Sequence, residues 1–262
     1  MPFTLSHAAA AIPFRRTRLV MSALVVGCFA PDFADFVYLK PHGTFGHSLA
    51  GIFFLDLPAS VLALWLFHTF IKRPLIFFLP NGVRRRLKDG GSAAFSFWPL
   101  SRLGMVLLSI FVGIATHIAW DSLTHDHYWP VRHRSFLSHY VELPITGAMK
   151  MDKLLEYSSS VLGLVMIAVW LCHWYRTTLS ASSLVEEPVS SAQMRAIVVL
   201  LSSLTILGAT FRACSTVGIP TDIRSIFHFT ADFLISAITF FVLGLLICGI
   251  SLRAWRSQHL RA

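Results

Sequence analysis

A histidine and an aspartate four residues apart are the strongest chemical signal in this sequence. His117 and Asp121 begin and end the run His-Ile-Ala-Trp-Asp, and on a helix this spacing places both side chains on one side. Such a pair can hold one metal ion or bridge two. Asp32 and His47 would complete a set of two nitrogen and two oxygen ligands. These four residues are therefore predicted to form a metal site.

The ligand types narrow the choice of ion. Imidazole and carboxylate without thiolate favour zinc or another first-row divalent ion, whereas calcium would need more oxygen ligands. An ion with an open coordination position lowers the pKa of bound water to about 7, which supplies a nucleophile for phosphoester or amide cleavage. His125 and His139 are candidates for a further ligand or a proton shuttle. The alternative is a purely structural hydrogen-bonded cluster.

The composition indicates that lipid surrounds the elements that carry these residues. Hydrophobic residues make up 55% of the 262 residues and charged residues 13%, against roughly 25% charged in a soluble domain. This leaves too little polar surface to cover a soluble globule. The net charge of +9 does not predict nucleic-acid binding, because the basic residues fall between apolar segments, where they set topology and meet anionic lipid.

Six apolar segments are candidates for membrane spans, since a span takes about 20 mostly apolar residues. The least apolar of them runs from Leu19 to about Leu39, because Asp32 and Asp35 follow Pro31. The others are Ser48–Ile71, Leu103–Trp120, Ser158–Tyr175, Ala196–Phe211 and Ile226–Leu252. We predict an all-α, polytopic membrane helix bundle with about six transmembrane helices and a single domain over residues 1–262, of which residues 195–252 supply the last two helices.

Basic residues set the predicted orientation. The loop over residues 72–102 is rich in Lys and Arg, so we expect it and both termini to be cytoplasmic. The remaining ionisable groups then converge on the outer face: Asp32, Asp35, His42, His47, His117, Asp121, His125, Asp126, His127, His133, His139 and Glu142. Such groups are expensive near a membrane and tend to mark sites. Asp56, His228 and Asp232 fall within spans, where we expect hydrogen bonds between helices.

Several motifs together resemble one bacterial membrane family, known as domain of unknown function 4184. They are the opening Met-Pro-Phe-Thr-Leu-Ser-His-Ala-Ala-Ala, Ala-Pro-Asp-Phe at 30–33, Gly-His-Ser at 46–48, and Thr-His-Ile-Ala-Trp-Asp-Ser-Leu-Thr-His at 116–125. The resemblance covers about residues 1–178 and is less distinct beyond them. It implies a bacterial origin and brings no established activity.

A more distant resemblance is to membrane-bound metal-dependent hydrolases and zinc-dependent phospholipase C proteins. An early His, a Pro-Asp, a His-Ser and a His-x-x-x-Asp follow in that order, at His7, Asp32, His47, His117 and Asp121. The order implies a multi-zinc phosphoester site. The spacing of further ligands downstream does not match. His7 also precedes the basic stretch at 15–18, so a simple first span would leave it on the side of the membrane opposite the cluster. Three alternatives follow: His7 is not a ligand, the N-terminal segment is re-entrant or interfacial, or the predicted orientation is reversed.

These patterns predict a metal-dependent hydrolase in the bacterial inner membrane that acts on a lipid or lipid-linked phosphoester. Asp32, His47, His117 and Asp121, with His7, would hold one or two divalent ions, most simply zinc. The alternatives are a non-catalytic membrane protein with a structural polar cluster, or a metal or ion transporter that uses Asp56, His228 and Asp232 as its path.

Overall fold

The protein is described by a computed structural model over residues 3–41, 45–87, 95–126, 128–144, 147–180 and 191–259. Helices make up 81% of the structure, and six of them are long and apolar enough to cross a membrane. These spans are Met21–Tyr38, Leu49–Phe78, Leu100–Asp121, Met151–Thr177, Ala192–Val217 and Ser225–Trp255. The predicted all-α, multi-pass bundle is confirmed, including the first span with its two aspartates.

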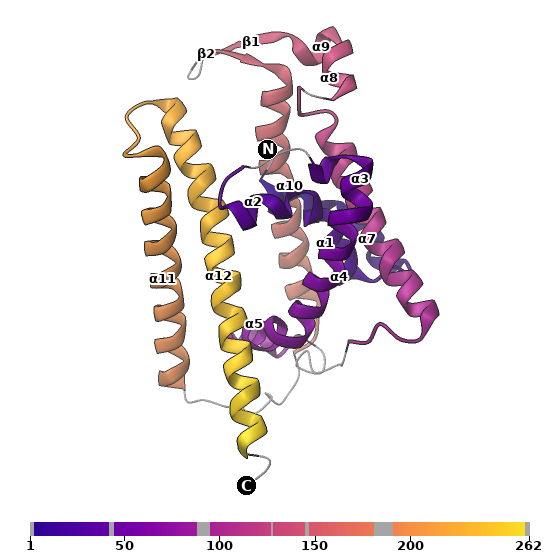
Figure 1. Ribbon diagram of the computed structural model, residues 1–262, viewed down its shortest axis with the longest axis vertical. Coiled ribbons are helices and arrows are strands. Elements are labelled where there is room, and N and C mark those ends of the chain that lie inside the picture. Colours follow the sequence, from indigo (N-terminus) through magenta and orange to yellow (C-terminus); the bar gives the residue numbers. More distant parts are fainter. Residues whose placement is uncertain are drawn as a thin grey trace. The chain divides into compact units, whose positions relative to one another are not determined.

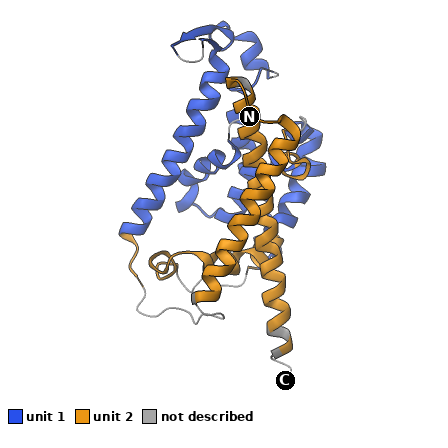
Figure 2. Ribbon diagram, turned by 90° about the vertical axis from the view of Figure 1, so that its left-hand side faces the viewer, with its two compact units in different colours: residues 1–33, 44–64, 96–176 blue, residues 34–43, 65–95, 177–262 orange. Residues whose placement is uncertain are grey.

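The chain folds into two compact units, shown in blue and orange in Figure 2. Unit 1 contains residues 1–33, 44–64 and 96–176, and unit 2 contains residues 34–43, 65–95 and 177–262. The prediction of a single membrane domain stays a prediction.

Unit 1 is organised around the pairing of α1 (Met21–Phe29) with α7 (Leu100–Asp121). Two glycines let the backbones of these helices touch: a methyl group at Gly27 would overlap the carbonyl of Ile110, and one at Gly113 would overlap the carbonyl of Leu24. Small residues at helix contacts allow this close approach in membrane proteins. The helix pair is thus held at a fixed separation by its main chains.

The N-terminal residues of unit 1 form a 3₁₀-helix, η1 (Thr4–Arg16), which packs against both α1 and α7. After α1 the chain continues as a short 3₁₀ turn, η2 (Ala30–Asp32). A second 3₁₀ turn, η3 (Phe45–His47), leads into α3 (Leu49–Gly51), whose first turn is capped by the Ser48 hydroxyl accepting from the Gly51 N–H at 3.0 Å. Such a cap satisfies a free donor at a helix start.

The rest of unit 1 begins with a π-helical turn, η4 (Ile52–Asp56), followed by α4 (Leu57–Leu66). Beyond α7 come α8 (Trp129–His133) and α9 (Ser135–Ser138). An antiparallel hairpin of β1 (Tyr140–Leu143) and β2 (Gly147–Lys150) follows, with Tyr140 opposite Lys150. The long helix α10 (Met151–Thr177) completes the unit.

Unit 2 is dominated by α11 (Ser191–Val217) and α12 (Ile223–His259), which lie side by side (Figure 1). It also contains α2 (Phe33–Tyr38), the π-helical segment η5 (Phe67–Ile71), α5 (Lys72–Phe78) and α6 (Asn81–Arg84). Its core includes Ile71, Leu201 and Leu245. The Thr216 hydroxyl of α11 donates to Asp232 of α12 at 2.7 Å, which is the predicted hydrogen bond between helices for this aspartate.

Candidate metal centre

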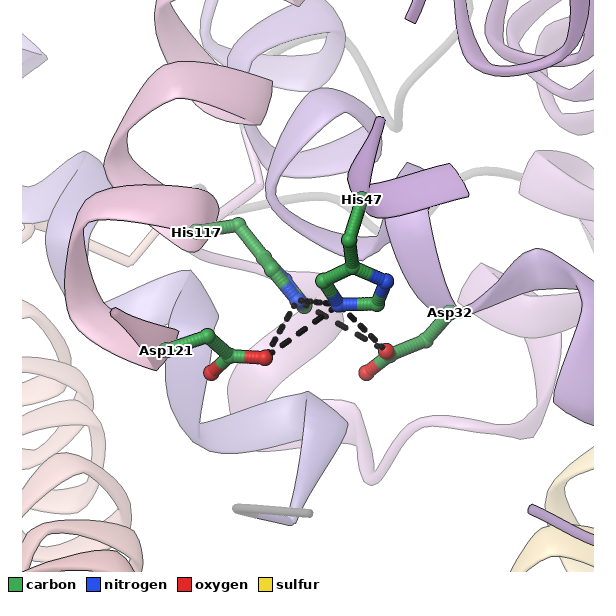
Figure 3. Close-up of side chains that lie close together, drawn as sticks. All are labelled: Asp32, His47, His117 and Asp121. Atoms are coloured by element: carbon green, nitrogen blue, oxygen red, sulfur yellow. Dashed lines mark hydrogen bonds and ion pairs between the residues drawn. The ribbon is translucent and has the colours of Figure 1, made fainter. Parts of the chain in front are cut away.

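Four of the predicted ligands meet in unit 1. One ligand atom from each of Asp32, His47, His117 and Asp121 lies within 4.8 Å of all the others. They come from three elements: Asp32 ends η2, His47 ends η3, and the other two lie in the last two turns of α7. Figure 3 shows the two rings and two carboxylates pointing toward one another. The i, i+4 pair on the helix is as predicted.

The distances within the cluster are those of groups arranged around a common point. The Nε2 atom of His117 lies 3.3 Å from Nε2 of His47, 3.3 Å from Oδ2 of Asp121 and 3.6 Å from Oδ1 of Asp32. The Nε2 atom of His47 lies 3.3 Å from the same Oδ2 and 3.7 Å from the same Oδ1. Two nitrogens and two oxygens therefore converge, which is the donor set that zinc accepts.

The converging side chains are almost completely buried, which is unusual for ionisable groups. Asp32 and Asp121 are each 1% exposed and His117 is fully buried. Oδ1 of Asp32 and Oδ1 of Asp121 accept no hydrogen bond from any described residue. Buried carboxylate oxygens are costly unless they are paired or coordinate a metal. The residues present thus fit a divalent cation.

Main-chain contacts orient His117. Its Nδ1 lies 2.8 Å from the carbonyl oxygen of Cys28, and because a carbonyl only accepts, Nδ1 carries the proton and donates it. The lone pair of a neutral ring is then on Nε2, which faces the cluster. Histidine ligands of metals are commonly held in this way by a hydrogen bond from the second ring nitrogen. The Gly27 and Gly113 contacts between α1 and α7 bring Cys28 within reach.

His7 lies at the cluster, contrary to the expectation for a simple first span. Its ring stacks on His117 with centroids 4.0 Å apart, and its Nε2 is 3.4 Å from Oδ1 of Asp121. The side chain is fully buried, and neither ring nitrogen has a hydrogen-bond partner among the described residues. Because η1 packs along α1 and α7, residue 7 and the cluster are at the same end of α7. The His7 side chain therefore lies beside the predicted ligands and not at the opposite end of α7.

Burial keeps His7 in the form that can bind a metal. Burial is the largest influence and lowers the pKa of this imidazole to about 3, although Asp121 acts in the opposite direction. The ring is therefore neutral at neutral pH and has a free lone pair. His7 and His117 face different oxygens of Asp121, so this carboxylate can bridge two positions.

Thr4 was not singled out in the sequence, yet it contacts the cluster directly. Its hydroxyl donates to Oδ2 of Asp32 at 2.6 Å. This hydrogen bond fixes one oxygen of the carboxylate and leaves Oδ1 facing the two histidines. Thr4 stands three residues before His7, which is one turn of the 3₁₀-helix η1, and this spacing is the only signal that could have linked the two.

The predicted proton shuttles differ in their positions. Nδ1 of His125 is 3.8 Å from Oδ2 of Asp121 and 3.1 Å from the Thr124 hydroxyl. Its side chain is 12% exposed, so it lies at the rim of the cluster, and burial lowers its pKa. His139 is exposed and, within the described part of the chain, has no side-chain bond to the cluster; its carbonyl accepts the Met151 N–H. His125 remains a candidate shuttle, and His139 lies apart.

The other polar residues expected on this face do not extend the cluster. Asp126, His133 and Glu142 are exposed, and His133 stacks on Trp129. Asp35 is buried on α2 in unit 2. His42 and His127 lie outside the described residues. The described metal-binding group is therefore compact: four converging residues, with His7 and His125 beside them.

Comparison with known proteins identifies a family and no closer relative with a known role. No curated protein and no solved structure matches the chain, so the more distant hydrolase resemblance gains no support. Residues 1–250 match the family described as domain of unknown function (DUF4184). The match continues well past residue 178, where the resemblance had become less distinct, and includes α11 and most of α12. The chain belongs to the DUF4184 family.

Proposed function

We propose that this protein is a membrane-embedded, metal-dependent hydrolase with zinc as its ion. The observation that carries the proposal is the convergence of four buried ligand atoms within 4.8 Å of one another. Asp32, His47, His117 and Asp121 would hold the ion. A divalent ion with an open coordination position polarises a phosphoryl oxygen and lowers the pKa of bound water to about 7.

The position of His7 supports a centre that can hold a second ion. Its Nε2, which has no hydrogen-bond partner among the described residues, faces Oδ1 of Asp121 at 3.4 Å, while His47 and His117 face Oδ2. A carboxylate shared between two cations is a common arrangement in phosphoester-cleaving enzymes with two metals. His125, at the rim, would move a proton between the centre and water.

The location of the centre supports a lipid or lipid-linked phosphoester as substrate. Asp32 lies within one apolar span, and His117 and Asp121 lie in the last turns of another. A centre at the end of a span is near the level of lipid headgroups, where the phosphoester of a lipid resides. We propose a bacterial inner membrane as its location.

The two alternative functions have less support. A structural polar cluster would be expected to satisfy its own atoms, but Oδ1 of Asp32, Oδ1 of Asp121 and both nitrogens of His7 lack hydrogen bonds from the described residues. A transport path was expected to use Asp56, His228 and Asp232. His228 is exposed and Asp232 is bonded to Thr216, so two of these three residues do not favour a transport path.

Metal content tests the proposal directly. We expect zinc in stoichiometric amount in protein purified in detergent without chelator, and its loss from the double variant His117→Ala, Asp121→Ala. The matched control is His133→Ala, Glu142→Ala, which removes one histidine and one carboxylate that are exposed in the same unit. It should keep its zinc. The zinc-loaded protein should release phosphate or a phosphorylated headgroup from phospholipid or lipid-diphosphate vesicles.

Absence of metal from the wild-type protein, even after titration with zinc, would overturn the proposal and favour a structural cluster. Equal zinc loss in the double variant and its control would show that the ion binds elsewhere. Zinc binding without turnover of any lipid phosphoester would leave a metal site and overturn the hydrolase function.

A further inference from the structure

Asp56 is a buried carboxylate that the metal centre described above does not use. Its side chain is fully buried, and neither carboxylate oxygen has a hydrogen-bond partner among the described residues. It ends the π-helical turn η4, in which the Leu57 N–H bonds to the Ile52 carbonyl five residues back. Single π-helical turns are frequent at functional sites. A buried carboxylate without hydrogen bonds costs free energy, so its presence at this position calls for a physical explanation.

Asp56 packs against the backbone that carries two of the four ligands. A Cβ atom at Gly46 would lie 3.1 Å from Oδ1 of Asp56 and 2.5 Å from the carbonyl oxygen of Pro31. Gly46 directly precedes His47, and Pro31 directly precedes Asp32. The absence of a side chain at Gly46 lets these two oxygens approach the same point. Asp56 is thus a neighbour of both metal-binding turns.

The position of Asp56 points to His47. Oδ1 of Asp56 faces Gly46, and Gly46 is the residue next to His47 in the chain. Asp56 belongs to the same unit as these residues. The carboxylate is therefore close enough to the centre to influence it, although it is not one of the four converging ligands.

His47 lacks the hydrogen bond that orients His117. Its Nε2 faces the cluster, and Figure 3 shows its second ring nitrogen directed away from His117 and Asp121. That atom, Nδ1, is buried and has no partner among the described residues. A neutral imidazole that gives its Nε2 lone pair to an ion must carry its proton on Nδ1. A buried Nδ1–H then needs an acceptor.

We propose that Asp56 is a positioning residue of the metal centre, whose carboxylate accepts the Nδ1 proton of His47 when Nε2 binds an ion. One buried donor without an acceptor and one buried acceptor without a donor are thereby matched. A hydrogen bond from a carboxylate to a ligand histidine fixes the ring and raises its basicity. The inference rests on the metal-binding part of the proposed function and does not depend on the substrate.

Zinc affinity in Asp56 variants tests this role. Asp56→Leu removes the acceptor, and we expect zinc affinity, measured by competition with a chromophoric chelator, to fall about 10–100-fold. Asp56→Asn keeps one acceptor oxygen, so its zinc affinity should lie between those of Asp56→Leu and wild type. The number of ions bound at saturating zinc should not change. Asp232→Asn, a buried carboxyl in unit 2, is the control and should bind zinc as wild type does.

Two further measurements separate positioning from a structural role. The thermal midpoint of metal-free Asp56→Leu should equal or exceed that of wild type, because the variant removes a buried unpaired carboxylate. The visible spectrum of the Co²⁺-loaded variant should shift, because the His47 ring is no longer fixed. A merely structural residue would give the opposite pattern: lower metal-free stability with unchanged affinity in the folded fraction.

Each contrary result has a distinct meaning. Zinc bound equally well by wild type and Asp56→Leu overturns the inference and leaves the metal centre in place. Fewer ions at saturation in the variant would make Asp56 a ligand, which also overturns the positioning role. If Asp56→Leu does not fold, the affinity of Asp56→Asn decides, and wild-type affinity there overturns the inference. No zinc in wild type overturns both proposals.

Discussion

The helix pairs α1–α7 in unit 1 and α11–α12 in unit 2 both pack through glycines, but the glycines meet different atoms. A methyl group at Gly27 or Gly113 would overlap main-chain atoms of the facing helix. A methyl group at Gly244 would meet the tip of the Leu201 side chain, and one at Gly208 would meet the Phe240 ring at 3.0 Å. A side chain can rotate away, whereas a helix backbone cannot.

The hydrogen bonding of buried polar groups also differs between the two helix pairs. In unit 2 the buried carboxylate of Asp232 has a hydroxyl donor, Thr216, on the neighbouring helix. In unit 1 carboxylates and imidazoles face each other, and several of their atoms have no hydrogen-bond partner among the described residues. The rigid pair thus carries an aspartate, Asp121, with one oxygen that accepts no hydrogen bond from the described residues, whereas the buried aspartate of the adaptable pair is already hydrogen-bonded.

The largest expected effect comes from breaking the backbone contact in unit 1. Gly27→Ala should lower the free energy of unfolding by about 3 kcal/mol, the upper range for overpacking, and should abolish most zinc binding, because α1 and α7 must separate. Gly244→Ala should change stability much less, since Leu201 can move. Thermal unfolding in detergent and zinc content measure both effects.

Gly104→Ala is the control for this pair of variants. Gly104 lies in α7 with no atom within 4 Å of an added methyl, so the variant should be as stable as wild type or slightly more so, because alanine favours helix. If Gly27→Ala were as stable as Gly104→Ala and kept its zinc, the proposed importance of the backbone contact would be refuted.

An intermediate effect is expected from His7→Phe, which keeps a ring for stacking on His117 and removes both nitrogens. Zinc affinity should fall at least about tenfold, or about 1.4 kcal/mol, and a second equivalent of zinc should be lost if His7 faces its own ion. His133→Phe, in the same unit but exposed, is the comparison. Isothermal titration with zinc should show that His133→Phe binds zinc as wild type does. If His7→Phe bound zinc equally well, His7 would not belong to the centre.

The smallest effect is expected in unit 2. Asp232→Leu removes the acceptor of the Thr216 hydrogen bond, and hydrogen bonds between membrane helices contribute only about 0.6 kcal/mol on average. Zinc binding should be unaffected. A large loss of stability, or any loss of zinc, would contradict the difference drawn here between the helix pairs α1–α7 and α11–α12. Thermal unfolding and zinc titration on one preparation of Asp232→Leu measure both effects.

The sequence predicts the spans well because hydrophobic length alone determines them. It also predicts the four converging residues, since ionisable groups near the ends of apolar segments are rare and the His117–Asp121 spacing is specific to a helix. Sequence spacing does not reveal main-chain partners, so the Cys28 carbonyl that orients His117 and the hydroxyl of Thr4 on Asp32 were not foreseen.

His7 and Asp56 show what sequence patterns leave open. The motif order predicts His7 as a ligand, but counting spans leaves its side of the membrane undecided, because counting cannot reveal that η1 is a 3₁₀-helix packed along α1 and α7. Asp56 was expected to bond to a neighbouring helix, but among the described residues it has no hydrogen-bond partner. The π-helical turn that directs it toward Gly46 has no recognisable pattern in the sequence.

The main-chain contact between α1 and α7 has a consequence for the membrane itself. Helices respond to bilayers of different thickness by tilting. Because Gly27 and Gly113 lock two backbones together, we expect α1 and α7 to tilt as one body, so that hydrophobic mismatch changes the inclination of the centre and not its internal distances. Ligand geometry in this protein should therefore be insensitive to lipid chain length.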